Sequence, residues 1–123
     1  MSAVKIFEME YEPDFEKNLN RLVKKKKFSS LPGQIRKLEK SFERGEFEGD
    51  RMTHRDFPTP HDVYKLRLPN PDTNVGKSNG YRVIYTVVTE FKLVVFLTIY
   101  YKKEMENVSD EYVKGLIDGY FPN

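Results

Sequence analysis

Basic side chains recur at the ends of three apolar segments of the chain. Lys65 and Arg67 alternate with leucines, so on a β-strand both would point to the same face. Arg82 interrupts the next apolar segment, and Lys102 and Lys103 close the last one. A sheet that gathers lysine and arginine in this way can bind the phosphate groups of a polyanion. The alternative, that these are ordinary solvated strand residues, stays open because lysine and arginine are usually exposed.

The charge of the chain is unevenly distributed. The net charge is only +2, but residues 61–103 hold seven Lys or Arg against three acidic residues. Residues 104–123 reverse this balance, with five acidic residues against Lys114. A local basic face matters more for binding a polyanion than the total charge does. One hypothesis is that the acidic segment 104–118 folds over that basic face.

The composition is that of one globular domain. The chain has 123 residues, of which 38% are hydrophobic and 33% are charged. No apolar run approaches the roughly 20 residues that span a bilayer. The first residues lack the apolar core of a secretory signal, so we expect a cytoplasmic protein without membrane association. The absence of cysteine excludes disulfides, a thiolate nucleophile and a zinc–thiolate site.

Hydrophobic spacing indicates the elements that would carry the basic residues. A first strand is expected within 3–11, and apolar residues at helical spacing follow Pro13 and Pro32, with Gly45 ending the second helix. Three strands are expected at about 62–68, 81–89 and 92–101, and Ser109 can cap a final helix. The order β-α-α-β-β-β-α predicts a single α+β domain over 1–123. Its sheet should be rich in antiparallel pairs, with the helices packed on one face.

Three motifs resemble one family of proteins. They are K-L-R-L at 65–68, G-K-S-N-G-Y-R-V-I-Y at 76–85 and F-L-T-I-Y-Y-K-K-E at 96–104. Together with the order of elements, they resemble the RelE/ParE superfamily of bacterial toxins, especially its HigB-like members. The resemblance implies the toxin of a type II toxin–antitoxin system. RelE- and HigB-like members are mRNA interferases that cleave messenger RNA in the ribosomal A site and so inhibit translation, and a cognate antitoxin silences them.

Two other functions are compatible with the same resemblance. ParE-like members share the fold but inhibit DNA gyrase without chemistry of their own. A toxin-fold relative that has lost its activity and only binds a partner is the other alternative. Of the three, we expect the function of the RelE- and HigB-like members, namely an endoribonuclease, and hence a hydrolase, of ribosome-bound mRNA. Its expected partners are mRNA, the ribosome and an antitoxin, with no cofactor and no metal.

By position, the resemblance implies a set of site residues. The expected catalytic residues are Lys65, Arg67, Arg82 and Lys103, and the expected RNA-binding residues are Lys77, Tyr100, Tyr101 and Lys102. Cleavage by the RNA 2′-hydroxyl requires a proton acceptor, a stabilised phosphorane and a proton for the leaving 5′-oxygen. Arg82 suits the second task because a guanidinium binds two phosphate oxygens.

Each of these assignments has a simpler alternative. Arg82 could form a salt bridge to Glu90 or Glu104, and either tyrosine could be a core residue. Lys65 or Lys103 could be the base or acid only if its pKa is lowered. The last strand ends in Tyr-Tyr-Lys-Lys without a histidine, which departs from relatives with a Glu/His pair. His54 and His61 are expected to be surface histidines, although His61 could act as acid or base.

Overall fold

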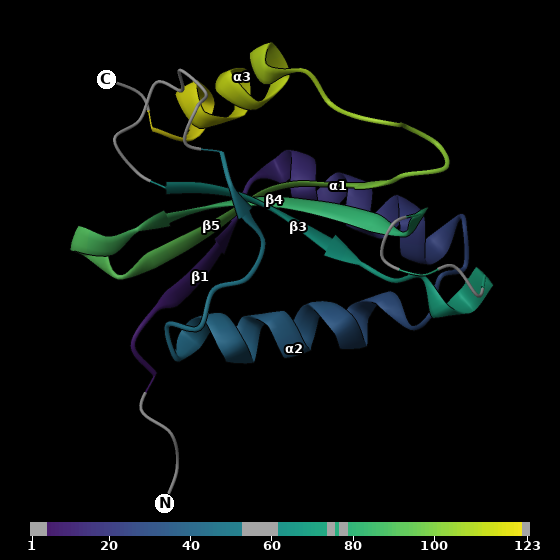
Figure 1. Cartoon of the computed structure of the whole chain (residues 1–123), viewed down its shortest axis with the longest axis horizontal. Helices are drawn as coiled ribbons and strands as arrows, with labels where there is room; N and C mark the ends of the chain where they lie inside the picture. Colours follow the sequence, from purple (N-terminus) through teal and green to yellow (C-terminus); the bar gives the residue numbers. More distant parts are fainter. Residues whose placement is uncertain (1–4, 53–61, 74–75, 77–78, 122–123) are drawn as a thin grey trace, which may run out of the picture.

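The order of elements agrees with the prediction. The computed structural model describes residues 5–52, 62–73, 76 and 79–121. The elements are β1 (Glu8–Tyr11), α1 (Pro13–Lys24), α2 (Leu31–Glu43), β2 (Asp50–Arg51), β3 (Asp62–Leu68), β4 (Tyr81–Val88), β5 (Leu93–Tyr101) and α3 (Asp110–Tyr120) (Figure 1). The short strand β2 is the one strand among the described residues that was not predicted, and two 3-10 turns, Pro71–Thr73 and Thr89–Phe91, are further additions.

The strands form one mixed sheet in the order β1-β5-β4-β3-β2. β1 runs parallel to β5, and the other pairs are antiparallel, which confirms the predicted antiparallel-rich sheet. β5 is paired on both sides and almost entirely buried, as its apolar sequence predicts. The basic residues of interest therefore lie on β3, on β4 and just beyond the end of β5, and these three strands are adjacent.

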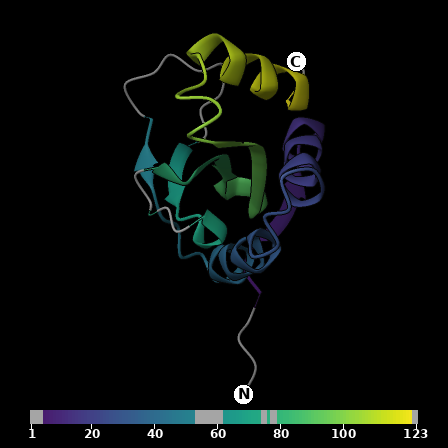
Figure 2. The ribbon, with the colours of Figure 1, turned by 90° about the vertical axis from the view of Figure 1, so that its right-hand side faces the viewer.

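The helices cover both faces of the sheet, which corrects the prediction that they share one face. Residues of α1 and α2 belong to one core cluster, and Val113 and Ile117 of α3 belong to a second cluster. Figure 2 shows the sheet between α2 on one side and α3 on the other. The apolar stripe of a helix indicates that one face is buried, but not which face of the sheet it meets. Because β5 has apolar side chains on both faces of the sheet, helices must cover both faces to keep these side chains from water.

Local sequence explains where the helices begin and end. Pro13 occupies the first turn of α1, where its missing N–H is not needed. Gly45, just beyond α2, has a φ of +80°, a conformation that glycine adopts without strain. The Ser109 hydroxyl accepts a hydrogen bond of 3.1 Å from the Tyr112 N–H and so caps α3 as predicted. The Ser30 hydroxyl donates to Asp72 at 2.6 Å and does not cap α2.

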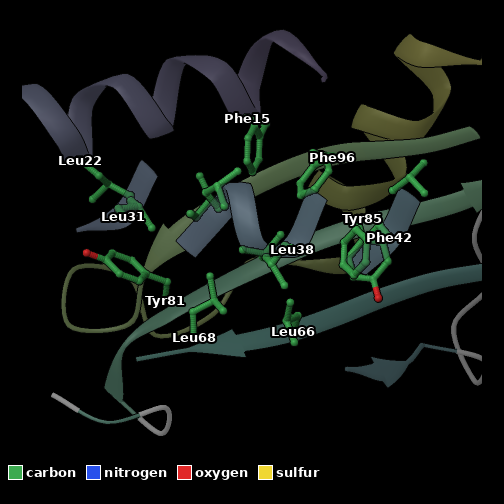
Figure 3. Packing of buried hydrophobic residues seen from close by; sticks show 14 of the residues in the cluster. Phe15, Leu22, Leu31, Leu38, Phe42, Leu66, Leu68, Tyr81, Tyr85 and Phe96 are labelled. Carbon is green, nitrogen blue, oxygen red and sulfur yellow. The ribbon is translucent and has the colours of Figure 1, made fainter. Parts of the chain in front are cut away.

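The larger core lies between the sheet and the helices α1 and α2 (Figure 3). Phe15 and Leu22 from α1 and Phe42 from α2 are fully buried against Tyr85 and other residues of the sheet. None of the helices in the described part of the chain has the length and apolar character that a bilayer crossing requires.

A β-bulge near the middle of β5 decides which face its last residues occupy. Ile84 pairs with Thr98 and Tyr85 pairs with Phe96, so Leu97 is an extra residue without a direct partner. Beyond the bulge, Tyr100 lies in the cluster under α3, and Tyr101 lies in the opposite core. Strict alternation from Phe96 would have given the reverse assignment. The bulge therefore turns Tyr100 toward the face that carries the basic residues.

Candidate functional site

A groove of about 550 Å³ gathers basic side chains from β3, from β4 and from the residue that follows β5. Two further lining residues come from the segment that connects β5 to α3. The full lining consists of Lys65, Arg67, Arg82, Tyr100, Lys102, Glu106 and Asn107. Five of the eight predicted site residues are thus brought together, and all five line one groove.

The strand register places these side chains. Arg67 pairs with Arg82 across β3 and β4, and Arg82 pairs with Tyr100 across β4 and β5. Directly paired residues share one face of a sheet, and Lys65 shares that face because it lies two residues from Arg67. The two guanidinium groups therefore come from opposed positions on neighbouring strands. This arrangement concentrates positive charge where a single phosphate could contact both.

Arg82 is the most buried charged residue among those described, with only 5% of its surface exposed. Burial, followed by the positive charge of Arg67, lowers the pKa of Arg82, against a smaller opposite effect of Tyr100. Its Nη1 donates to the Tyr81 carbonyl at 3.3 Å. An arginine that is partly desolvated beside a second arginine gains stability when an anion binds between them.

Among the described residues, Arg82 forms no salt bridge to Glu104 or Glu90, which was the alternative interpretation. Glu104 binds Arg21 and Lys26, with nitrogen–oxygen distances of 3.0 Å to each. Glu90 lies in the exposed turn Thr89–Phe91, which follows the far end of β4. Arg82 instead faces the groove with Arg67.

Asn107 organises one side of the groove. Its Oδ1 accepts hydrogen bonds from Lys65 Nζ at 2.9 Å, from the Tyr100 hydroxyl at 3.2 Å and from the Val108 N–H at 3.0 Å. Burial raises the pKa of Tyr100, partly offset by Arg82, so the phenol stays protonated and donates at neutral pH. Sequence reasoning missed Asn107 because it lies in a loop and belongs to no motif.

The acidic segment meets the basic face, as hypothesised, but only in part. Glu106 lines the groove, and α3 covers the same face of the sheet. Glu104 points instead to the basic end of α1.

Two predicted site residues lie elsewhere, and a third is not among the described residues. Tyr101 is corrected to a core residue: its ring packs edge-on against Phe28 at a centroid distance of 5.1 Å, on the face opposite the groove. Lys103 is exposed in the turn after β5 and does not line the groove. Lys77 and the histidines His54 and His61 lie outside the described residues.

The Glu104 carboxylate should contribute to the stability of the fold in a pH-dependent way. Hydrogen bonds from Arg21 and then Lys26 lower the pKa of Glu104 below its ordinary value of 4.5, although burial works in the other direction. A carboxylate whose folded pKa is lowered stabilises the fold above its unfolded pKa, and this stabilisation is lost as the pH falls through the folded value.

Glu104→Gln should therefore lower the free energy of unfolding near neutral pH by less than about 1 kcal/mol, since the pair is partly exposed. The difference from wild type should shrink at an acidic pH that lies below the lowered pKa of Glu104. Urea unfolding at both pH values measures it, with the exposed Glu90→Gln as control. An equal loss of stability at both pH values would contradict the assignment.

Comparison with known proteins identifies the fold. No protein-family model matches the chain, and no curated protein matches it in sequence. The crystal structure of the isolated E. coli RelE toxin is similar with a TM-score of 0.53, covering 94% of this chain and 99% of that chain at 19% identity. A free E. coli RelE variant with two arginine-to-alanine substitutions gives a TM-score of 0.51, covering 82% and 88% at 20% identity. The resemblance to RelE is thus confirmed for the fold.

Proposed function

We propose that this chain is an endoribonuclease, the toxin of a type II toxin–antitoxin system that cleaves ribosome-bound mRNA in the cytoplasm. The observation that carries the proposal is the pairing of Arg67 with Arg82 in a groove that Lys65 and Lys102 also line. The RelE fold supports it, because the similar solved structures are those of a toxin.

The groove suits the recognition of one phosphodiester. A guanidinium can bind two phosphate oxygens at once, and two guanidinium groups from adjacent strands can hold both non-bridging oxygens. These contacts strengthen as the phosphate becomes a phosphorane with an additional negative charge, so they favour the transition state over the bound substrate. Arg82 is the better placed of the two because it is already partly desolvated before RNA binds.

Proton transfer completes the proposed reaction. The 2′-oxygen attacks phosphorus and loses its proton, the bond from phosphorus to the 5′-oxygen breaks, and that oxygen gains a proton. The products are a 2′,3′-cyclic phosphate and a 5′-hydroxyl. Lys65 is the proposed proton-transfer residue, held by Asn107, and the Tyr100 phenol donates a hydrogen bond at the same edge.

The proposed partners follow from the same groove. Messenger RNA and the ribosome supply phosphates, and the contact should weaken as salt rises. An antitoxin that silences the chain would need acidic or bulky residues that cover this basic surface.

Primer extension on a reporter mRNA in a purified translation system tests the proposal. We expect discrete cuts that require both the chain and ribosomes, with cyclic-phosphate ends at the upstream fragments. Naked mRNA of the same sequence is the control for ribosome dependence. An intact mRNA would contradict the proposal, and a supercoiling assay with DNA gyrase would then separate a ParE-like inhibitor from an inactive binding protein.

A further inference from the structure

A second cavity, of about 530 Å³, opens beside the basic groove. Tyr100 and Asn107 line both cavities, so the two are direct neighbours. The other walls come from α1, β5, the segment that leads into α3 and the first turn of α3. They include Asn18, Arg21, Met105, Val108 and Tyr112. The volume lies within the range of about 300–1,000 Å³ that is typical of sites for small organic groups.

Two walls of this cavity carry flat groups whose positions are fixed. The Arg21 guanidinium, which is planar, donates two hydrogen bonds to Glu104, at 3.2 and 3.0 Å, and these fix its orientation. The Tyr112 hydroxyl donates to Asp14, which ties the start of α3 to the start of α1. Unstacked RNA bases pack on aromatic rings and on arginine planes of this kind.

Polar groups at the cavity wall suit the edge of a base. Asn18 Nδ2 donates to Asp14 at 3.1 Å and to Thr98 at 3.2 Å, so its Oδ1 is the atom of this amide that can accept from a ligand. Asn107 is the reverse case, because its Oδ1 accepts the hydrogen bonds from Lys65, Tyr100 and Val108, and its Nδ2 can donate. One acceptor and one donor on apolar walls can bind the hydrogen-bonding edge of a nucleobase.

We infer that this cavity is a nucleobase site, which holds the base of the nucleotide whose phosphate occupies the basic groove. The inference rests on the proposed function, since it requires RNA in the groove. A base and its phosphate are joined through a single sugar, so they need two neighbouring sites of different chemistry. The charged groove and the partly apolar cavity, which share Tyr100 and Asn107, are such a pair.

Binding of a short single-stranded 2′-fluoro RNA tests the inference without cleavage, because this RNA has no 2′-hydroxyl nucleophile. Fluorescence anisotropy would compare the parent RNA with versions that lack one base at each position in turn. We expect removal of the base at one position to weaken binding to the wild-type chain about tenfold, the size of one stacking contact.

A matched pair of variants locates the effect in the protein. Val108→Phe fills the cavity and should bind the parent RNA about tenfold more weakly, with no further loss when the base is removed. Ile6→Phe adds a similar ring at an exposed residue ahead of β1 and should behave as wild type. Circular dichroism confirms that each variant is folded before binding is measured.

The outcomes separate this inference from the proposed function. The nucleobase site is wrong if removing the base has no effect at any position. It is also wrong if Val108→Phe and the wild-type chain lose the same affinity when the base is removed. In that case a loss of RNA affinity in Arg67→Ala would still support the proposed function. If Arg67→Ala binds the parent RNA as tightly as wild type, the groove itself does not bind RNA, and both are wrong.

Discussion

Replacing Arg82 by alanine should lower the rate of RNA cleavage at least a hundredfold while the chain stays folded. The loss of one preorganised donor to a developing oxyanion typically costs about 10²–10³ in rate. Arg82 lies at the inner end of the groove, 5% exposed and paired across strands with Arg67. The fold should survive, because burial and then repulsion by Arg67 lower the pKa of Arg82, and the substitution removes the buried charge that both disfavour.

Two further variants show whether the guanidinium, and not positive charge alone, is needed. Arg82→Lys keeps the charge but loses the paired donors, so we expect it to recover only a small part of the rate. Lys103→Ala removes a positive charge from the exposed turn beside the groove and should cleave at nearly the wild-type rate. Cleavage is followed by primer extension, and folding by urea unfolding. A folded Arg82→Ala that cleaves at the wild-type rate would show that the site lies elsewhere.

Most of the elements could be predicted because they depend on short-range patterns. Proline and glycine at the helix ends, and long apolar segments for β4 and β5, act within a few residues. Such patterns do not specify which face of a sheet a helix covers, so the position of α3 was predicted wrongly. The strand β2 has only two residues, too few for any periodic signal.

The candidate site could be predicted only where strands alternate regularly. Lys65, Arg67 and Arg82 lie on β3 and the first part of β4, and their faces follow from spacing and register. The extra residue Leu97 reverses the alternation on β5, which is why Tyr100 and Tyr101 could not be told apart in sequence. Asn107 enters the groove through a loop, whose path depends on the packing of α3 and not on local residues.

Replacing Phe96 by alanine should cost about 3–5 kcal/mol of the free energy of unfolding, the typical loss for a buried phenylalanine. Phe96 is fully buried, and its ring lies 5.2 Å from that of Tyr11 and 5.0 Å from that of Phe15, measured between centroids. It also meets Phe42 of α2 and Tyr85 of β4, at 5.7 and 6.3 Å. One ring thus joins β1, both helices of the larger core and the neighbouring strand. Figure 3 shows it beside Phe15, Phe42 and Tyr85.

The surroundings of Phe96 should not collapse to fill the space, because its neighbours are rings anchored on four different elements. A loss of this size is a large part of the roughly 5–15 kcal/mol that holds a domain folded.

Phe91→Ala is the matched control, since Phe91 is 73% exposed in the β4–β5 turn and should change stability by less than about 0.5 kcal/mol. Urea unfolding of the two variants measures both. A loss below about 1 kcal/mol for Phe96→Ala would mean that the aromatic cluster repacks. The same ring precedes the bulge that orients Tyr100, so in a Phe96 variant that stays folded, RNA cleavage should fall as well.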